Sequence, residues 1–206
     1  MSPFSVGDAF RFGGSHLLRN LPLFVAIEAG IVAVWVVLEA LVFRFASSPG
    51  SFWHVVLHLL WFLAMSLPEA ALLRVALSIR ESGSWDRTDL AAALRLTPTF
   101  FVVKLIYLLI VAIGLVLLIV PGVWLAVRYA PWGFVVTGGA RHPAAALRLS
   151  AGLTRGVKWR LLGFGLLLML VNALGVALLG LGLILTLPLT AMAAAFVFDQ
   201  LRERNR

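Results

Sequence analysis

The chain has 206 residues, of which 62% are hydrophobic and only 13% are charged. Soluble proteins contain about 45–50% apolar residues and about 25% charged residues. This chain therefore has too few charges to cover a water-soluble fold, and we expect lipid to be its main solvent. The absence of cysteine excludes disulfides, thiolate metal sites and cysteine nucleophiles.

Six apolar segments are predicted to span a membrane, whose hydrocarbon core requires a helix of about 20 residues. In chain order they cover residues 21–43, 52–79, 100–120, 123–136, 161–179 and 181–198. Pro121-Gly122 predicts a tight turn between the third and fourth spans, and little more than Gly180 separates the last two. The fourth span is short and contains Arg128 and Pro131. The predicted fold is an all-α, polytopic membrane helix bundle with its six spans paired as three hairpins.

The positive charges fall mostly between spans on one side of the predicted membrane. With the N-terminus inside, 13 of the 17 Lys and Arg residues lie in cytoplasmic segments, and the outer connections contain only Arg44. The 13 are Arg11, Arg19, Arg80, Arg87, Arg95, Arg141, Arg148, Arg155, Lys158, Arg160, Arg202, Arg204 and Arg206. Since positive loops stay in the cytoplasm, we expect an inner-membrane protein with both termini inside. The same rule explains the formal net charge of +8 without a nucleic-acid partner.

An internal repeat precedes the predicted hairpins. The string Ala-Ala-Ala-Leu-Arg-Leu occurs at Ala91–Leu96 and at Ala144–Leu149, and a weaker copy occupies Gly7–Phe12. Each copy predicts a short amphipathic helix in the membrane interface, with basic groups at anionic headgroups. The repeat units cover approximately residues 5–79, 89–138 and 143–200 of a single membrane domain, residues 1–206. Chance recurrence in a chain rich in Ala, Leu and Arg is the alternative.

Several stretches of the chain resemble one known family. They are Ser5–Phe12, Pro121–Ala130, Ala145–Gly156 and Lys158–Gly163. They resemble the glycerophosphoryl diester phosphodiesterase membrane-domain family and the related YciC-like bacterial membrane proteins. The resemblance implies a multi-span helical module without catalysis, because in fused members a separate metal-dependent barrel carries the phosphodiesterase chemistry. Thr137-Gly138-Gly139 departs from the family pattern, which often has an acidic residue there.

Ionisable residues inside spans are functional candidates because charge is costly at membrane depth. Glu39, His58 and Arg128 are predicted at similar depth near the outer surface, with Glu39 as the counter-charge for Arg128. A second possible group on the inner side contains Glu28, Glu69, Arg74 and Lys104. Glu28 and Glu39 share one helix face, which we expect to point into the bundle. These charges form either structural ion pairs or a pathway for a proton, an ion or a polar solute.

Other patterns predict packing rather than chemistry. His54 and His58 could bind a metal together with Glu39. No further polar residue is predicted beside them to orient the histidine rings, so we expect no metal and no cofactor. Asn172 is expected to form an interhelical hydrogen bond. Small residues are expected to pack the last two helices closely. The glycines among these small residues are Gly163, Gly165, Gly175, Gly180 and Gly182.

Trp53 and Trp85 lie near the two ends of the second predicted span, as expected for an aromatic belt at each membrane interface.

We expect a non-enzymatic membrane module that binds lipid or a partner membrane protein. The basic residues expected at anionic headgroups on the cytoplasmic side are Arg11, Arg95, Arg148, Arg155 and Lys158. The main alternative is a small transporter or channel-like protein that works through Glu39 and Arg128. An enzyme that acts on a lipid within the bilayer is a third possibility, but the sequence offers no catalytic set for it.

Overall fold

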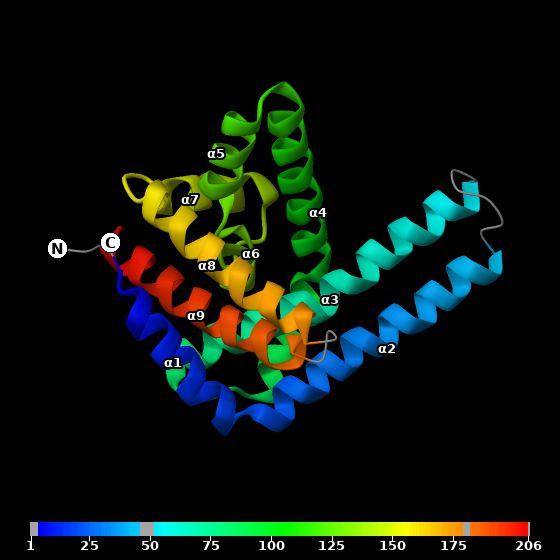
Figure 1. Ribbon diagram of the computed structural model, residues 1–206, viewed down its shortest axis with the longest axis horizontal. Coiled ribbons are helices and arrows are strands. Elements are labelled where there is room, and N and C mark those ends of the chain that lie inside the picture. The colour runs from blue at the N-terminus through cyan, green and yellow to red at the C-terminus, as the bar shows by residue number, and fades with distance from the viewer. Residues whose placement is uncertain (1–3, 46–51, 179–181, 206) are drawn as a thin grey trace.

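The computed structural model describes residues 4–45, 52–178 and 182–205, which form nine α-helices and no β-strand (Figure 1). The predictions for Gly180 and Arg206 fall outside these residues. The helices are α1 (Val6–Arg19), α2 (Leu21–Phe45), α3 (Phe52–Ser82), α4 (Arg87–Leu117), α5 (Ile119–Tyr129), α6 (Trp132–Thr137), α7 (Pro143–Leu153), α8 (Lys158–Ala177) and α9 (Leu183–Arg204). The predicted all-α class is confirmed.

Six helical stretches of the described chain are long and apolar enough to cross a membrane. They are Leu21–Arg44, Phe52–Ser82, Arg87–Leu117, Ile119–Thr137, Lys158–Ala177 and Leu183–Arg204. Many large apolar side chains are exposed along them, among them Val116 at 87% and Val120 at 79%. Exposed apolar patches of this extent mark a surface that another apolar phase covers. The six stretches correspond in order to the six predicted spans and indicate a multi-pass membrane protein.

The buried core lies at one end of the molecule, which we call the base. It is formed by α1, the start of α2, the second half of α3, the first half of α4, α6, α7, the first half of α8 and α9. The α2–α3 pair and the α4–α5 pair leave the base in different directions (Figure 1). The long helices therefore share a packed base, and the α2–α3 and α4–α5 pairs diverge beyond it.

The amphipathic segment expected ahead of the third span is not a separate helix. α4 runs unbroken from Arg87 to Leu117, so Ala91–Leu96 forms part of its first turns. A capping box begins the helix, in which Asp86 accepts from the Arg87 N–H at 2.6 Å and Asp89 accepts from the Asp86 N–H at 3.0 Å. Separate helices do precede α2 and α8, namely α1 and α7.

The apolar face of α1 packs on protein, not on an open membrane surface. Ala9, Gly13 and Leu17 are buried, and α1 lies along α9 (Figure 1). A Cβ on Gly13 would lie 3.0 Å from the carbonyl oxygen of Leu189. Small side chains on this face thus let the two backbones approach closely. Arg11 is exposed on α1.

The chain reverses between α4 and α5 at Leu118, so the predicted turn at Pro121-Gly122 is wrong. Leu118 is extended, with φ −164° and ψ 146°. Pro121 instead lies in the first turn of α5, where its missing N–H has no intrahelical partner to lose. Gly122 is required for packing, because a Cβ there would lie 2.6 Å from the backbone nitrogen of Leu115.

α8 and α9 approach each other through glycine in the same way. A Cβ on Gly182 would lie 2.7 Å from the Cα of Gly175. Asn172 Nδ2 lies 3.3 Å from the Thr190 hydroxyl oxygen. The close contact predicted at Gly175 and Gly182 and the interhelical bond predicted for Asn172 are therefore confirmed. A Cβ on the other two described glycines would meet open space, so the prediction for them is wrong; they are Gly163 and Gly165.

Candidate functional site

The structure does not bring Glu39, His58 and Arg128 together. Glu39 and His58 are exposed on the halves of α2 and α3 that extend away from the base. Arg128 lies near the end of α5, which packs on α4, α7 and α8. Within the described ranges, no ion pair joins Glu39 to Arg128. Packing of α5 on these neighbours holds Arg128 away from α2, so the predicted outer cluster is not formed.

The two histidines of α3 contact each other at its first turns. His58 Nδ1 lies 2.8 Å from the carbonyl oxygen of His54, and the two ring centroids are 4.2 Å apart. Across residues 4–45, 52–178 and 182–205, no group of three or more His, Cys, Asp or Glu side chains is arranged to hold a metal ion.

The predicted inner group separates into distinct parts. Both carboxylate oxygens of Glu69 accept from Lys104 Nζ, at 2.7 and 2.8 Å, which joins α3 to α4. Glu28 is 3% exposed, and one of its carboxylate oxygens, Oε1, has no hydrogen-bond partner. Arg74 pairs with an acid that was not in the predicted group.

That acid is Asp89, whose side chain is 8% exposed. Its Oδ1 lies 2.9 Å from one terminal nitrogen of Arg74 and 3.1 Å from Nε. Its Oδ2 accepts from the Ser78 hydroxyl at 2.8 Å. Arg74 also donates to the carbonyl oxygen of Thr137 at 3.0 Å. The network therefore joins α3, α4 and α6 at the base. The sequence signal that could have pointed to Asp89 is the Asp-x-x-Asp pattern of Asp86 and Asp89, which is typical of a helix start.

A cavity of about 640 Å³ adjoins this network, and we call it the arginine cavity. Its lining residues are Arg74, Thr88, Ala91, Ala92, Arg95, Leu96, Thr99, Thr137, Gly139 and Arg141. Three arginines and three threonines supply its polar groups, and none of these lining residues is acidic. The cavity therefore presents an excess of positive charge and hydrogen-bond donors.

A larger groove of about 880 Å³ lies between α5 and the start of α8, and we call it the α5–α8 groove. Its aliphatic lining residues are Ile119, Val120, Val123, Val127, Val157 and Leu162. Two tryptophans, Trp124 and Trp159, and three cationic residues, Arg155, Lys158 and Arg160, complete the lining with Gly156. The groove thus combines a long apolar wall with a cluster of positive charge.

Trp124 connects the apolar and cationic parts of this groove. Lys158 Nζ lies 3.5 Å from a Trp124 ring centroid, and the Arg128 guanidinium lies 5.1 Å from a Trp124 ring centroid. Cations over aromatic faces are attracted by the ring quadrupole. Arg128 therefore belongs to the α5–α8 region, where its predicted motif partner Trp124 lies, and not to an outer ion pair.

The break between α5 and α6 is stabilised by hydrogen bonds from neighbouring helices. Pro131 lies directly before α6 and has no N–H, and the last carbonyls of α5 lack intrahelical partners. The buried Thr154 hydroxyl donates to the carbonyl oxygen of Arg128 at 2.9 Å. The Tyr107 hydroxyl donates to the carbonyl oxygen of Ala126 at 3.3 Å. Non-helical backbone at membrane depth requires such partners.

The five predicted headgroup residues occupy different surfaces of the base. Arg95 lines the arginine cavity, and Arg155 and Lys158 line the α5–α8 groove. Arg11 and Arg148 are exposed outside both sites. The structure therefore places three of the five predicted basic residues in two separate sites, which their spacing in the sequence did not distinguish.

Comparison with models of protein families, with curated proteins and with solved structures finds no match to this chain.

Proposed function

We propose that the chain is a non-enzymatic integral membrane module that binds an anionic phospholipid in the α5–α8 groove. One observation carries this proposal: the groove joins a wall of aliphatic side chains to Arg155, Lys158 and Arg160. A phospholipid has the matching chemistry, with an apolar acyl chain attached to a negatively charged headgroup.

The two halves of the groove contribute different parts of the binding free energy. Each acyl methylene group removed from water contributes about 0.8 kcal/mol, but a lipid already in the bilayer gains little of this on moving to the protein. Each cationic side chain near an anionic lipid surface contributes about 1 kcal/mol. Selectivity for the lipid class therefore comes from the basic residues, and the apolar wall determines the position of the lipid's acyl chain.

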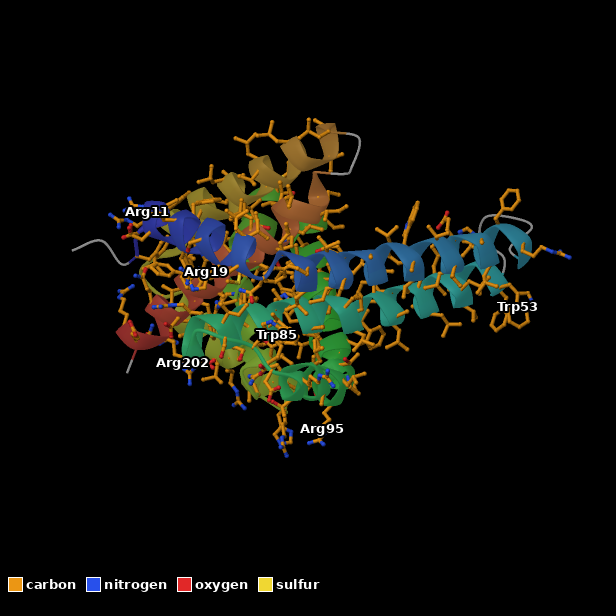
Figure 2. The ribbon with its side chains drawn as sticks, turned by 90° about the horizontal axis from the view of Figure 1, so that it is seen from below. Arg11, Arg19, Trp53, Trp85, Arg95 and Arg202 are labelled. Carbon is orange, nitrogen blue, oxygen red and sulfur yellow. The ribbon has the colours of Figure 1, made fainter. Side chains whose placement is uncertain are left out.

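We further infer that the base faces the cytoplasm and that the six spans form three hairpins. In Figure 2, Arg11, Arg19, Arg95 and Arg202 lie at the base, whereas Trp53 lies at the far end of the α2–α3 pair. The Ser5 N–H donates to Gln200 Oε1 at 3.3 Å, so the start of α1 and the end of α9 lie together. These positions support an orientation with both termini inside a bacterial inner membrane.

The resemblance to the phosphodiesterase membrane domains also remains our proposal. Its support is that three of the matching stretches meet in space. Lys158, the first residue of α8, contacts Trp124 of α5, and Thr154 contacts Arg128 of α5. Two residues of the groove's apolar wall, Val123 and Val127, belong to the first of these stretches. Transport through Glu39 and Arg128 is not proposed, because the structure places these residues in different parts of the molecule.

Native mass spectrometry of the detergent-purified protein tests lipid binding directly. We expect the wild type to retain phosphatidylglycerol in preference to phosphatidylcholine when both are supplied in equal amounts. The double variant Lys158→Gln/Arg160→Gln removes two charges from the groove and should lose the preference by roughly tenfold or more. The matched control Arg11→Gln/Arg19→Gln removes two exposed charges from α1 and should keep it.

Two results would oppose the proposal. Equal retention of both lipids by the wild type would show that the groove does not select anionic headgroups. An equal loss in the control variant would show that total charge, and not the groove, determines retention.

A further inference from the structure

We propose that the arginine cavity is a second binding site, which takes the phosphate group of an anionic ligand through Arg74, Arg95 and Arg141. This site extends the proposed function but does not depend on the α5–α8 groove. Its ligand is identified by chemistry as a phosphate ester, which is either a lipid headgroup at the inner surface or a soluble phosphate.

Two of the three arginines have uncompensated charge. Arg95 and Arg141 are exposed, and in the described part of the chain no acidic side chain pairs with either. Arg74 is neutralised by Asp89 at 2.9 Å. The cavity therefore carries a formal charge near +2, which matches a phosphate anion. In Figure 2, Arg95 projects from the base away from the ribbon, so an anion can reach it.

Arg74 is fixed in position at the wall of the cavity. A guanidinium has five N–H donors, and three of those on Arg74 are used by Asp89 and the Thr137 carbonyl. Two donors remain for a ligand. Because Asp89 and Thr137 already hold the side chain, binding costs little further conformational entropy. Arginine also matches the planar, bidentate geometry of phosphate oxygens.

The connection between α6 and α7 brings Arg141 to α4. The Thr99 hydroxyl donates to the carbonyl oxygen of Arg141 at 3.3 Å, which joins this connection to the same helix that carries Arg95. Gly139 also lines the cavity, and its φ of 112° is strained for any residue with a side chain. Thr137 and Gly139 both line the cavity, and neither brings a negative charge to it.

The lining of the cavity distinguishes its ligand from that of the groove. Its apolar side chains are those of Ala91, Ala92 and Leu96. Two alanines and one leucine form no apolar wall for an acyl chain. The arginine cavity can therefore hold a headgroup but not a lipid tail. A phosphate without an acyl chain is therefore expected to bind in the arginine cavity.

A thermal-shift titration with inorganic phosphate tests the site, with chloride at equal ionic strength as the reference. We expect phosphate to raise the thermal midpoint of the wild type in detergent. Arg95→Gln/Arg141→Gln should lower the apparent phosphate affinity at least about tenfold. Both residues are exposed, so the variant should fold, and Arg95→Lys/Arg141→Lys should recover part of the affinity because it keeps the charges.

Two matched variants separate this site from other basic surfaces. Arg11→Gln/Arg148→Gln removes two exposed charges outside the cavity, and Lys158→Gln/Arg160→Gln removes two from the groove. Both should keep the phosphate response. If the groove variant loses phosphatidylglycerol retention but keeps this response, the two proposals are shown to be independent.

The source of the phosphate is resolved by nanodiscs. A response to inorganic phosphate in nanodiscs of phosphatidylcholine alone supports a soluble ligand. A phosphatidylglycerol-dependent rise in the midpoint that Arg95→Gln/Arg141→Gln removes supports a lipid headgroup. The proposal is overturned if neither phosphate nor phosphatidylglycerol raises the midpoint, or if Arg11→Gln/Arg148→Gln removes the response as completely as the cavity variant does.

Discussion

Individual residues at the base combine structural and binding roles, and Asp89 is the most constrained of them. Its two carboxylate oxygens accept from Arg74, Ser78 and the Asp86 N–H. A buried charge without its partner is far more costly than a surface charge without one. The Glu81–Arg202 pair offers the comparison, because its side chains are 37% and 43% exposed.

Asp89→Asn is expected to destabilise the protein by about 3 kcal/mol, because it leaves the Arg74 charge uncompensated at the base. Glu81→Gln is expected to cost about 1 kcal/mol or less, since exposed ion pairs contribute little. Thermal unfolding in detergent gives the comparison. Equal losses in the two variants would contradict the structural role assigned to Asp89.

Thr154 is a second residue whose role depends on a single hydrogen bond. Thr154→Val keeps the shape of the side chain but removes the donor to the Arg128 carbonyl, so we expect a loss of about 1–3 kcal/mol. Thr154→Ser keeps the hydroxyl and should retain more of the stability than the valine variant. A valine variant with an unchanged thermal midpoint would show that the break between α5 and α6 does not require this donor.

At the scale of elements, the helix pairs α4–α5 and α8–α9 share one device, which is a close approach of two glycines near their connection. Gly114 meets Gly122 in the first pair, and Gly175 meets Gly182 in the second. In lipid, close packing replaces the hydrophobic effect as the force between helices. Van der Waals contact at these glycines is therefore expected to stabilise both pairs.

Gly122→Ala should destabilise the protein by about 1–3 kcal/mol, because the added Cβ overlaps the backbone of Leu115. Gly163→Ala is the matched control: nothing lies within 4 Å of its Cβ position, and alanine favours a helix by roughly 0.5–1 kcal/mol over glycine. The thermal midpoints should therefore move in opposite directions. A neutral Gly122→Ala variant would contradict the close approach.

The sequence could predict elements better than contacts. Hydropathy and length were sufficient for the six spans, and Pro131 indicated the break after α5. The turn at Leu118 could not be predicted, because Pro121 fits the first turn of a helix as well as it fits a β-turn. Asp89 belongs to the capping box at the start of α4, and only the packing of α3 on α4 makes it the partner of Arg74.

At the scale of the whole molecule, the separation of a packed base from projecting helix pairs was not predictable. The outer parts of α2, α3 and α4 have exposed apolar residues on several sides, so their sequence does not specify which face meets a neighbour. Glu39 and Arg128 were predicted to pair because they lie at similar depth. Depth does not specify which helices are neighbours, and the structure does not form this pair. The position of arginines together at one end of the molecule could be predicted, because it depends only on where the positive charges fall between the apolar segments.

The central claim is that the base faces the cytoplasm, because both proposed sites lie at this arginine-rich end and bind anionic ligands there. The chain has no cysteine, so single thiols can be introduced at three exposed positions: Ser84→Cys, Leu118→Cys and His142→Cys. Labelling with a membrane-impermeant maleimide in right-side-out and inverted vesicles should place Ser84 and His142 inside and Leu118 outside. Labelling of Ser84 or His142 from the outside, or of Leu118 from the inside, would contradict the account.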